Sequence, residues 1–139
     1  MRKPLMVMVV AVMAAIGHTA PAQASVNTVD MPFGMAYGNS TTSGTIHFTD
    51  GYTASVSGAV HAASGLRQVC AQGVNGSLTS GRPLCSPYAF EGGPNQTISG
   101  SLRIPVAGGV QRVYITMYDE YNVPLAREFC TRNGCTRER

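Results

Sequence analysis

The chain has 139 residues, of which 44% are hydrophobic and 12% are charged, and its formal net charge is +3. This length allows one domain, the apolar content is too high for a disordered chain, and the charge is too low for a coiled coil. Two of the positive charges, Arg2 and Lys3, lie in a segment that we expect to be removed, which leaves about +1. We therefore expect no nucleic-acid partner, because neutralising phosphates requires many clustered cations.

The first 24 residues have the three zones of a secretory signal peptide. Arg2 and Lys3 form a positive start, residues 5–16 are an uncharged apolar run, and Ala22-Gln23-Ala24 is a small-x-small cleavage motif. As a helix the apolar run would span about 18 Å, which is too short for the ~30 Å hydrocarbon layer of a membrane. We expect a cleaved signal peptide over 1–24, a single secreted domain over 25–139, and no membrane association after cleavage.

Every basic residue after Lys3 is an arginine. We interpret this bias as the composition of a GC-rich bacterial gene. Together with the signal peptide, it predicts a bacterial protein that works outside the cell, or in the periplasm or cell-wall space.

All four cysteines lie in the part that we expect to be exported: Cys70, Cys85, Cys130 and Cys135. An even number of cysteines in a small exported chain predicts two disulfides. Three pairings are possible, and we favour Cys70–Cys85 with Cys130–Cys135 because each pair is local and brackets Gly or Pro turns. The spacings lack the Cys-x-x-Cys or His pairs of a zinc site.

Apolar and polar side chains alternate repeatedly after residue 24, and no helical periodicity is present. The alternation is cleanest over residues 45–49, 52–61, 97–104 and 112–118. It is typical of antiparallel strands with one buried and one solvated face. Further strands are expected at 31–37, 68–74, 77–80 and 123–130. About seven short strands predict an all-β, immunoglobulin-like sandwich of two antiparallel sheets, with a small β-barrel as the alternative.

The first hairpin can be predicted in more detail. A three-residue loop of Thr49, Asp50 and Gly51 would pair Phe48 with Tyr52 and put all apolar side chains on one face.

Three other segments are less regular. Residues 25–40 contain either an edge strand or a mobile leader, residues 82–94 read as a long loop held at Cys85, and residues 131–139 read as a turn and a loose tail.

The chain lacks the usual catalytic motifs, such as a nucleophile elbow or a His-Glu-x-x-His helix. His47, predicted opposite Thr53, and His61 are expected on polar strand faces, far apart. Asp119 and Glu120 are neighbours in a predicted turn, where they are expected to form the turn, with a calcium site as the open alternative. We therefore expect no enzyme, no cofactor and no metal.

One predicted strand carries residues suited to binding. Its outer side bears Arg112, Tyr114 and Tyr118, with Tyr121 just beyond, and Arg103 of the preceding strand is expected beside them. Tyrosine and arginine are enriched at binding hot spots. The sequence thus favours a secreted, non-catalytic binding module for an extracellular protein, polymer or small molecule, with cell-wall or carbohydrate ligands included.

Two other functions remain open from the sequence. A secreted protease inhibitor could present the disulfide-held loop from Ser80 to Asn95, where Leu84 is the candidate recognition residue because Pro83 follows Arg82. A hydrolase could assemble its residues only in three dimensions, by joining a histidine, a carboxylate and a serine in a cleft.

Overall fold

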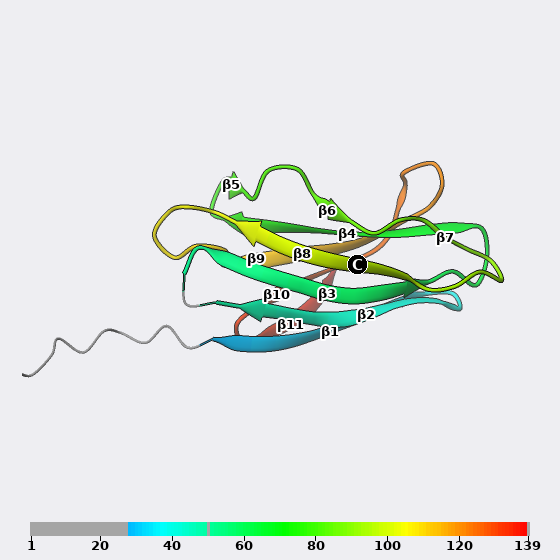
Figure 1. Cartoon of the computed structure of the whole chain (residues 1–139), viewed down its shortest axis with the longest axis horizontal. Helices are drawn as coiled ribbons and strands as arrows, with labels where there is room; N and C mark the ends of the chain where they lie inside the picture. The colour runs from blue at the N-terminus through cyan, green and yellow to red at the C-terminus, as the bar shows by residue number, and fades with distance from the viewer. Residues whose placement is uncertain (1–27, 50, 139) are drawn as a thin grey trace, which may run out of the picture.

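The structure is a computed structural model that describes residues 28–49 and 51–138. Its strands form two antiparallel sheets whose strands follow the long axis of the molecule (Figure 1). The first sheet has the order β1-β2-β3-β8, with β1 at Val29–Tyr37, β2 at Ser40–Phe48, β3 at Thr53–His61 and β8 at Gln96–Arg103. The second has the order β11-β10-β9-β4-β5, with β4 at Leu66–Asn75, β5 at Leu78–Thr79, β9 at Arg112–Tyr118, β10 at Pro124–Thr131 and β11 at Gly134–Glu138. Two short strands, β6 (Leu84–Cys85) and β7 (Ala89–Phe90), also pair with β4.

The predicted all-β sandwich of two antiparallel sheets is confirmed. Its core lies between the sheets, where Ile46 and Val56 of the first sheet and Val113 and Ile115 of the second are fully buried. Each of these residues alternates with a more exposed neighbour, so the period-two pattern correctly identified the inner faces. None of the described segments forms an apolar helix of membrane-crossing length.

The first hairpin differs from its predicted register by two residues. Phe48 pairs with Ala54 rather than Tyr52, and His47 pairs with Ser55 rather than Thr53. Thr49, which was predicted to lie in the loop, instead extends the pairing of the two strands, because its backbone N–H donates to the carbonyl of Thr53 (3.2 Å). An offset of two residues leaves every side chain on its predicted face, so hydrophobic patterning alone could not distinguish the two registers.

Several irregular segments have more structure than the sequence suggested. The segment expected as an edge strand or a mobile leader contains strand β1, which is an edge strand. The expected loose tail is wrong, because β11 pairs with β10 over five residues. The long loop contains β6 and β7, which pair with β4. The expected signal peptide over 1–24 lies outside the described residues.

The two favoured disulfides are confirmed. Cys70–Cys85 joins β4 to β6, and Cys130–Cys135 joins β10 to β11. In each case the two cysteines are directly paired residues of neighbouring antiparallel strands. Two disulfides in a chain of this size are typical of proteins that fold in an oxidising compartment.

Side chains of the second sheet hold the outer edge of β1. The carboxylate of Glu128 accepts a hydrogen bond from the Gly34 backbone N–H (2.9 Å), and the Arg137 guanidinium donates to the Ala36 carbonyl. An edge strand otherwise offers unpaired backbone groups to other chains, so these bonds close the edge and join the two sheets. Glu128 is 5% exposed, at a position that the strand pattern assigns to the core.

The burial of Glu128 predicts a specific pH dependence of stability. Burial raises the pKa of the Glu128 carboxyl above its ordinary value of 4.5, against the Gly34 N–H and Arg137, which lower it. Because the folded-state pKa is the higher one, the folded protein binds the proton more tightly. This contribution to stability is present in acid and is lost as the pH rises through the raised pKa. Glu128→Gln should remove it, so the melting temperature of the wild type should fall relative to that of the variant as the pH rises above the ordinary carboxyl pKa of 4.5.

The matched control is Glu91→Gln, which changes an exposed carboxylate. Melting curves of the three proteins from below pH 4.5 to above it separate the Glu128 contribution from the other carboxylates. A wild-type profile that stays parallel to that of Glu128→Gln would contradict the assignment.

Candidate functional site

The outer face of the second sheet is centred on β9. Val113, Ile115 and Met117 of this strand are fully buried, so Arg112, Tyr114, Thr116 and Tyr118 point to the opposite side. Strand β9 lies between β4 and β10 and pairs with both of them. Its backbone groups therefore take part in two ladders, and side chains supply most of the recognition groups on this face.

Arginines and aromatic rings alternate across β9 and β10. Tyr114 pairs directly with Phe129, and their ring centroids are 5.8 Å apart. The guanidinium of Arg127 lies 4.1 Å above the Tyr114 ring, and that of Arg112 lies 4.4 Å above the Phe129 ring. These cation–π contacts restrict two long side chains that would otherwise be mobile. Both arginines remain exposed to solvent.

Three hollows follow one another along this face and around its end. The first, of about 190 Å³, is lined by Arg127, Tyr118 and Tyr114. The second, of about 420 Å³, lies on the other side of Tyr114 and is lined by Arg112, Gln111 and Thr131. The third, also of about 420 Å³, shares Gln111 and Thr131 with the second and contains Arg132. We call this succession the arginine track; its arginines are Arg127, Arg112 and Arg132.

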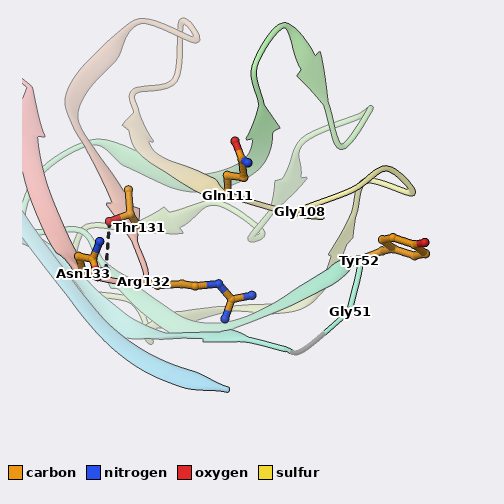
Figure 2. A pocket seen from close by; sticks show the side chains of 7 residues that line it. All are labelled: Gly51, Tyr52, Gly108, Gln111, Thr131, Arg132 and Asn133. Atoms are coloured by element: carbon orange, nitrogen blue, oxygen red, sulfur yellow. Dashed lines mark hydrogen bonds between the residues drawn. The ribbon is translucent and has the colours of Figure 1, made fainter. Parts of the chain in front are cut away.

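The third hollow lies at one end of the sandwich, among three connections between strands (Figure 2). Arg132 extends into it from the turn between β10 and β11, between the segment of Gly108 and Gln111 and the segment of Tyr52. The Arg132 guanidinium donates to the Thr49 carbonyl (2.6 Å) and lies 5.3 Å from the Phe48 ring. Arg132 therefore also ties this end of the two sheets together.

The arginine track is positively charged. None of the three hollows is lined by a described aspartate or glutamate. The nearest acidic partner on the face is Glu138, whose Oε2 lies 3.5 Å from Nε of Arg127. An anionic ligand would therefore meet two or three guanidiniums with little competing negative charge.

The structure brings together part of the predicted binding set. Arg112, Tyr114 and Tyr118 lie on one face, as expected. Arg103 does not join them, because β8 belongs to the other sheet, where its guanidinium lies 5.9 Å from the Tyr52 ring. Tyr121 is 80% exposed, in the turn between β9 and β10, and does not line the track.

Sequence reasoning missed Arg127 and Phe129, which complete the row. The signal was present, because Arg127 and Phe129 alternate with Glu128 and Cys130 in the last predicted strand. The turn predicted at residues 119–122 implies that this strand pairs with 112–118. Pairing the two strands would have placed both residues beside Tyr114.

The disulfide-held loop forms one wall of the first hollow. Two amides of β4 fix it, since Gln68 donates to the Ser86 carbonyl (2.8 Å) and Gln72 donates to the Gly81 carbonyl (2.9 Å). Pro83 lines the hollow from this loop, as does Cys70 from β4. Leu84, the candidate residue for protease recognition, instead packs against the core and over Gly100 of β8. Its side chain would have to leave the core to enter a protease, so no observation favours the inhibitor.

A histidine, a carboxylate and a serine do lie in one row on the outer face of the first sheet. Asp30 pairs with His47, which pairs with Ser55, and Nδ1 of His47 is in contact with the Asp30 carboxylate. No hydrogen bond joins His47 to Ser55 in the described structure, and none of the hollows described above is lined by the three residues. His61 contacts Asn95 instead (3.0 Å). Without a cleft, this row does not favour a hydrolase.

The candidate metal ligands have other partners. The Asp119 carboxylate accepts backbone N–H groups of Tyr121 and Val123 (both 2.9 Å), as expected of a turn-forming residue. Glu128 lies close to two cysteine sulfurs, but both sulfurs are in a disulfide and are not thiolates. No ligand set for a cation is therefore assembled at these two positions.

Fold and site together define a small, disulfide-linked β-sandwich with a positively charged, aromatic outer face. A comparison with known proteins found no matching family model, no matching curated protein and no matching solved structure.

Proposed function

We propose that this protein is a secreted, non-catalytic binding module whose ligand lies along the arginine track. Its place of action is outside the cell, in the extracellular or cell-wall space. The disulfides and the signal-like first 24 residues support export. The observation that carries the proposal is the ordered row of Arg112, Phe129, Tyr114 and Arg127, with a hollow on each side of Tyr114.

The row resembles a binding site because contacts within the protein already hold its side chains in place. Exposed arginine side chains lose conformational entropy when a ligand fixes them, and this loss weakens binding. Here the rings of Tyr114 and Phe129 already hold the guanidiniums, and the fixed loop already holds Pro83 at the rim of the first hollow. Such pre-organisation favours a stable binding surface over an ordinary solvated face.

The test is retention of the purified, oxidised protein on the insoluble wall fraction and on culture-fluid components of the source organism. We expect the wild type to be retained and Tyr114→Ala and Tyr118→Ala each to lose at least about tenfold in retention, because each removes a wall of the first hollow. Both side chains are partly exposed, so both variants should remain folded by circular dichroism.

The matched control is Tyr37→Ala, since Tyr37 is 47% exposed, lies on β1 of the first sheet and lines none of the three hollows. Its retention should equal that of the wild type. Retention that survives both Tyr114→Ala and Tyr118→Ala would remove this face from the function. No retention of the wild type on either fraction would contradict the binding module itself.

A further inference from the structure

We propose that the ligand of the arginine track is a linear anionic polysaccharide whose sugar units carry carboxylates. The inference rests on the proposed function and adds the chemical class of the ligand. It depends on three properties of the site, which are the hydrogen-bond donors of Arg112 and Arg127, the succession of the hollows and the chemical groups that line the hollows.

The guanidiniums are arranged to bind carboxylates. The guanidinium carbon of Arg112 lies 4.4 Å from the Phe129 ring centroid and that of Arg127 lies 4.1 Å from the Tyr114 ring centroid, and each arginine lines one of the first two hollows. In the described structure, Arg127 uses Nε for Glu138, and its two terminal nitrogens have no hydrogen-bond partner. Arg112 makes one long hydrogen bond to the Tyr114 hydroxyl (3.4 Å). A planar guanidinium with unused donors matches the two oxygens of a carboxylate.

The hollows favour a ligand with repeating charges. The first and second hollows each contain one arginine, and Tyr114 lines both of them. The second hollow and the third hollow share the lining residues Gln111 and Thr131, so they are neighbours. A single small anion would occupy one hollow and leave the others empty. A chain with one carboxylate per repeat could use successive hollows at once, which raises its affinity through multivalency.

The groups on the face favour a sugar chain over a peptide. When a peptide binds as an added strand, its affinity comes mainly from backbone hydrogen bonds to a free strand edge. Strand β9 has no free edge, because it pairs with β4 and β10. Side chains provide hydroxyl and amide groups instead, and Tyr118 and Pro83 provide apolar walls. The first hollow, at about 190 Å³, has room for about six water molecules of about 30 Å³ each, which is the scale of one sugar ring.

The experiment is calorimetric titration of the oxidised protein with polygalacturonate oligomers at low ionic strength. A matched ligand, the same oligomers with methyl-esterified carboxylates, keeps the sugar and removes the charge. The variants are Arg112→Gln and Arg127→Gln, singly and together, with Arg127→Lys as the conservative change. Arg103→Gln is the matched control, because it removes an exposed arginine from the other sheet.

We expect polygalacturonate to bind and its methyl ester not to bind. Each single glutamine variant should weaken binding about tenfold, and the double variant about a hundredfold, as for the loss of one and two charge-assisted contacts. Arg127→Lys should also weaken binding several-fold, because lysine keeps the charge but not the planar fork. Arg103→Gln should bind like the wild type. Binding should weaken strongly in about 1 M salt, where the screening length falls to about 3 Å.

Four results would overturn the inference. Equal binding of the methyl ester would exclude the carboxylate contacts. If Arg103→Gln weakened polygalacturonate binding as much as Arg112→Gln or Arg127→Gln does, binding would be a nonspecific attraction to positive charge. Tighter binding of poly-glutamate of the same length would replace the polysaccharide by an acidic peptide. No binding of polygalacturonate, with tyrosine-dependent retention on the wall fraction intact, would reject the anionic class and leave the proposed binding module standing.

Discussion

Replacing Cys70 and Cys85 together by alanine is expected to lower the free energy of unfolding by about 3 kcal/mol. The two cysteines are separated by 15 positions, and the cross-link restricts the unfolded chain over that loop. A domain of this size has a total stability of only ~5–15 kcal/mol, so the loss would be a large share of it. Urea unfolding of the oxidised wild type and of the double variant measures the difference.

The second disulfide provides the comparison. Cys130 and Cys135 are separated by only five positions, and the same loop-entropy argument gives about 2 kcal/mol for removing this bridge. The Cys70–Cys85 variant should therefore be the less stable of the two. The reverse order would show that the bridge between β10 and β11 contributes in the folded state, through its buried Cys130 sulfur, more than through the unfolded chain.

The Cys70–Cys85 variant also has an expected effect on ligand binding. The bridge fixes the start of the loop that carries Pro83, and Pro83 and Cys70 both line the first hollow. Without the bridge, that wall depends on the hydrogen bonds from Gln68 and Gln72 to the loop. Retention should fall for this variant at temperatures where it is still folded.

The sequence predicted which face each side chain occupies better than it predicted which residues are neighbours. Alternation assigns Phe48 to the core whether it pairs with Tyr52 or with Ala54, because the two registers differ by an even number of residues. The Thr49 backbone N–H and the Thr49 hydroxyl both donate to the Thr53 carbonyl in the observed register, and no hydrophobic pattern encodes these hydrogen bonds.

It was harder still to predict which residues of different strands lie close together in the sandwich. Arg103 and Arg112 are close in sequence, and consecutive strands usually pair. The chain instead crosses from one sheet to the other between β8 and β9, so the two arginines lie in different sheets. Arg127 joins the site through a simple hairpin, which makes it predictable in principle, whereas the exclusion of Arg103 depends on a crossover that strand patterns do not specify.

Glu128 shows a second way in which the sequence pattern fails to predict a contact. Its place in the alternation assigns it to the core, where a carboxylate is costly to bury without a partner. Its partner is the Gly34 N–H of a strand 94 positions away, on the other sheet. A charged residue at a core position is therefore a signal of an inter-sheet contact, although the sequence does not name the partner.

Gly44→Ala is expected to lower the free energy of unfolding by about 3 kcal/mol, the upper end of the usual cost of overpacking. Gly44 pairs with Phe33 on one side and with Gly58 on the other, and the Phe33 ring lies across both glycines. A Cβ at position 44 would lie 2.2 Å from the Ser57 carbonyl oxygen and 2.7 Å from Cζ of Phe33. Phe33 is 5% exposed and has little free space, and the Ser57 oxygen belongs to the backbone of β3.

The matched control for this change is Gly34→Ala, one strand away on the outer face. A Cβ there would approach nothing closer than the Thr42 carbonyl at 3.7 Å, which is an ordinary contact. An exposed strand glycine restricts the unfolded chain when it becomes alanine, so this variant should be neutral or slightly more stable. Equal stability of Gly44→Ala and Gly34→Ala in urea unfolding would mean that β2 and β3 can separate at Gly44 without cost. The close packing of Phe33 over the glycine pair would then contribute little to holding β1 in the first sheet, and the bonds from Glu128 and Arg137 would have to hold it instead.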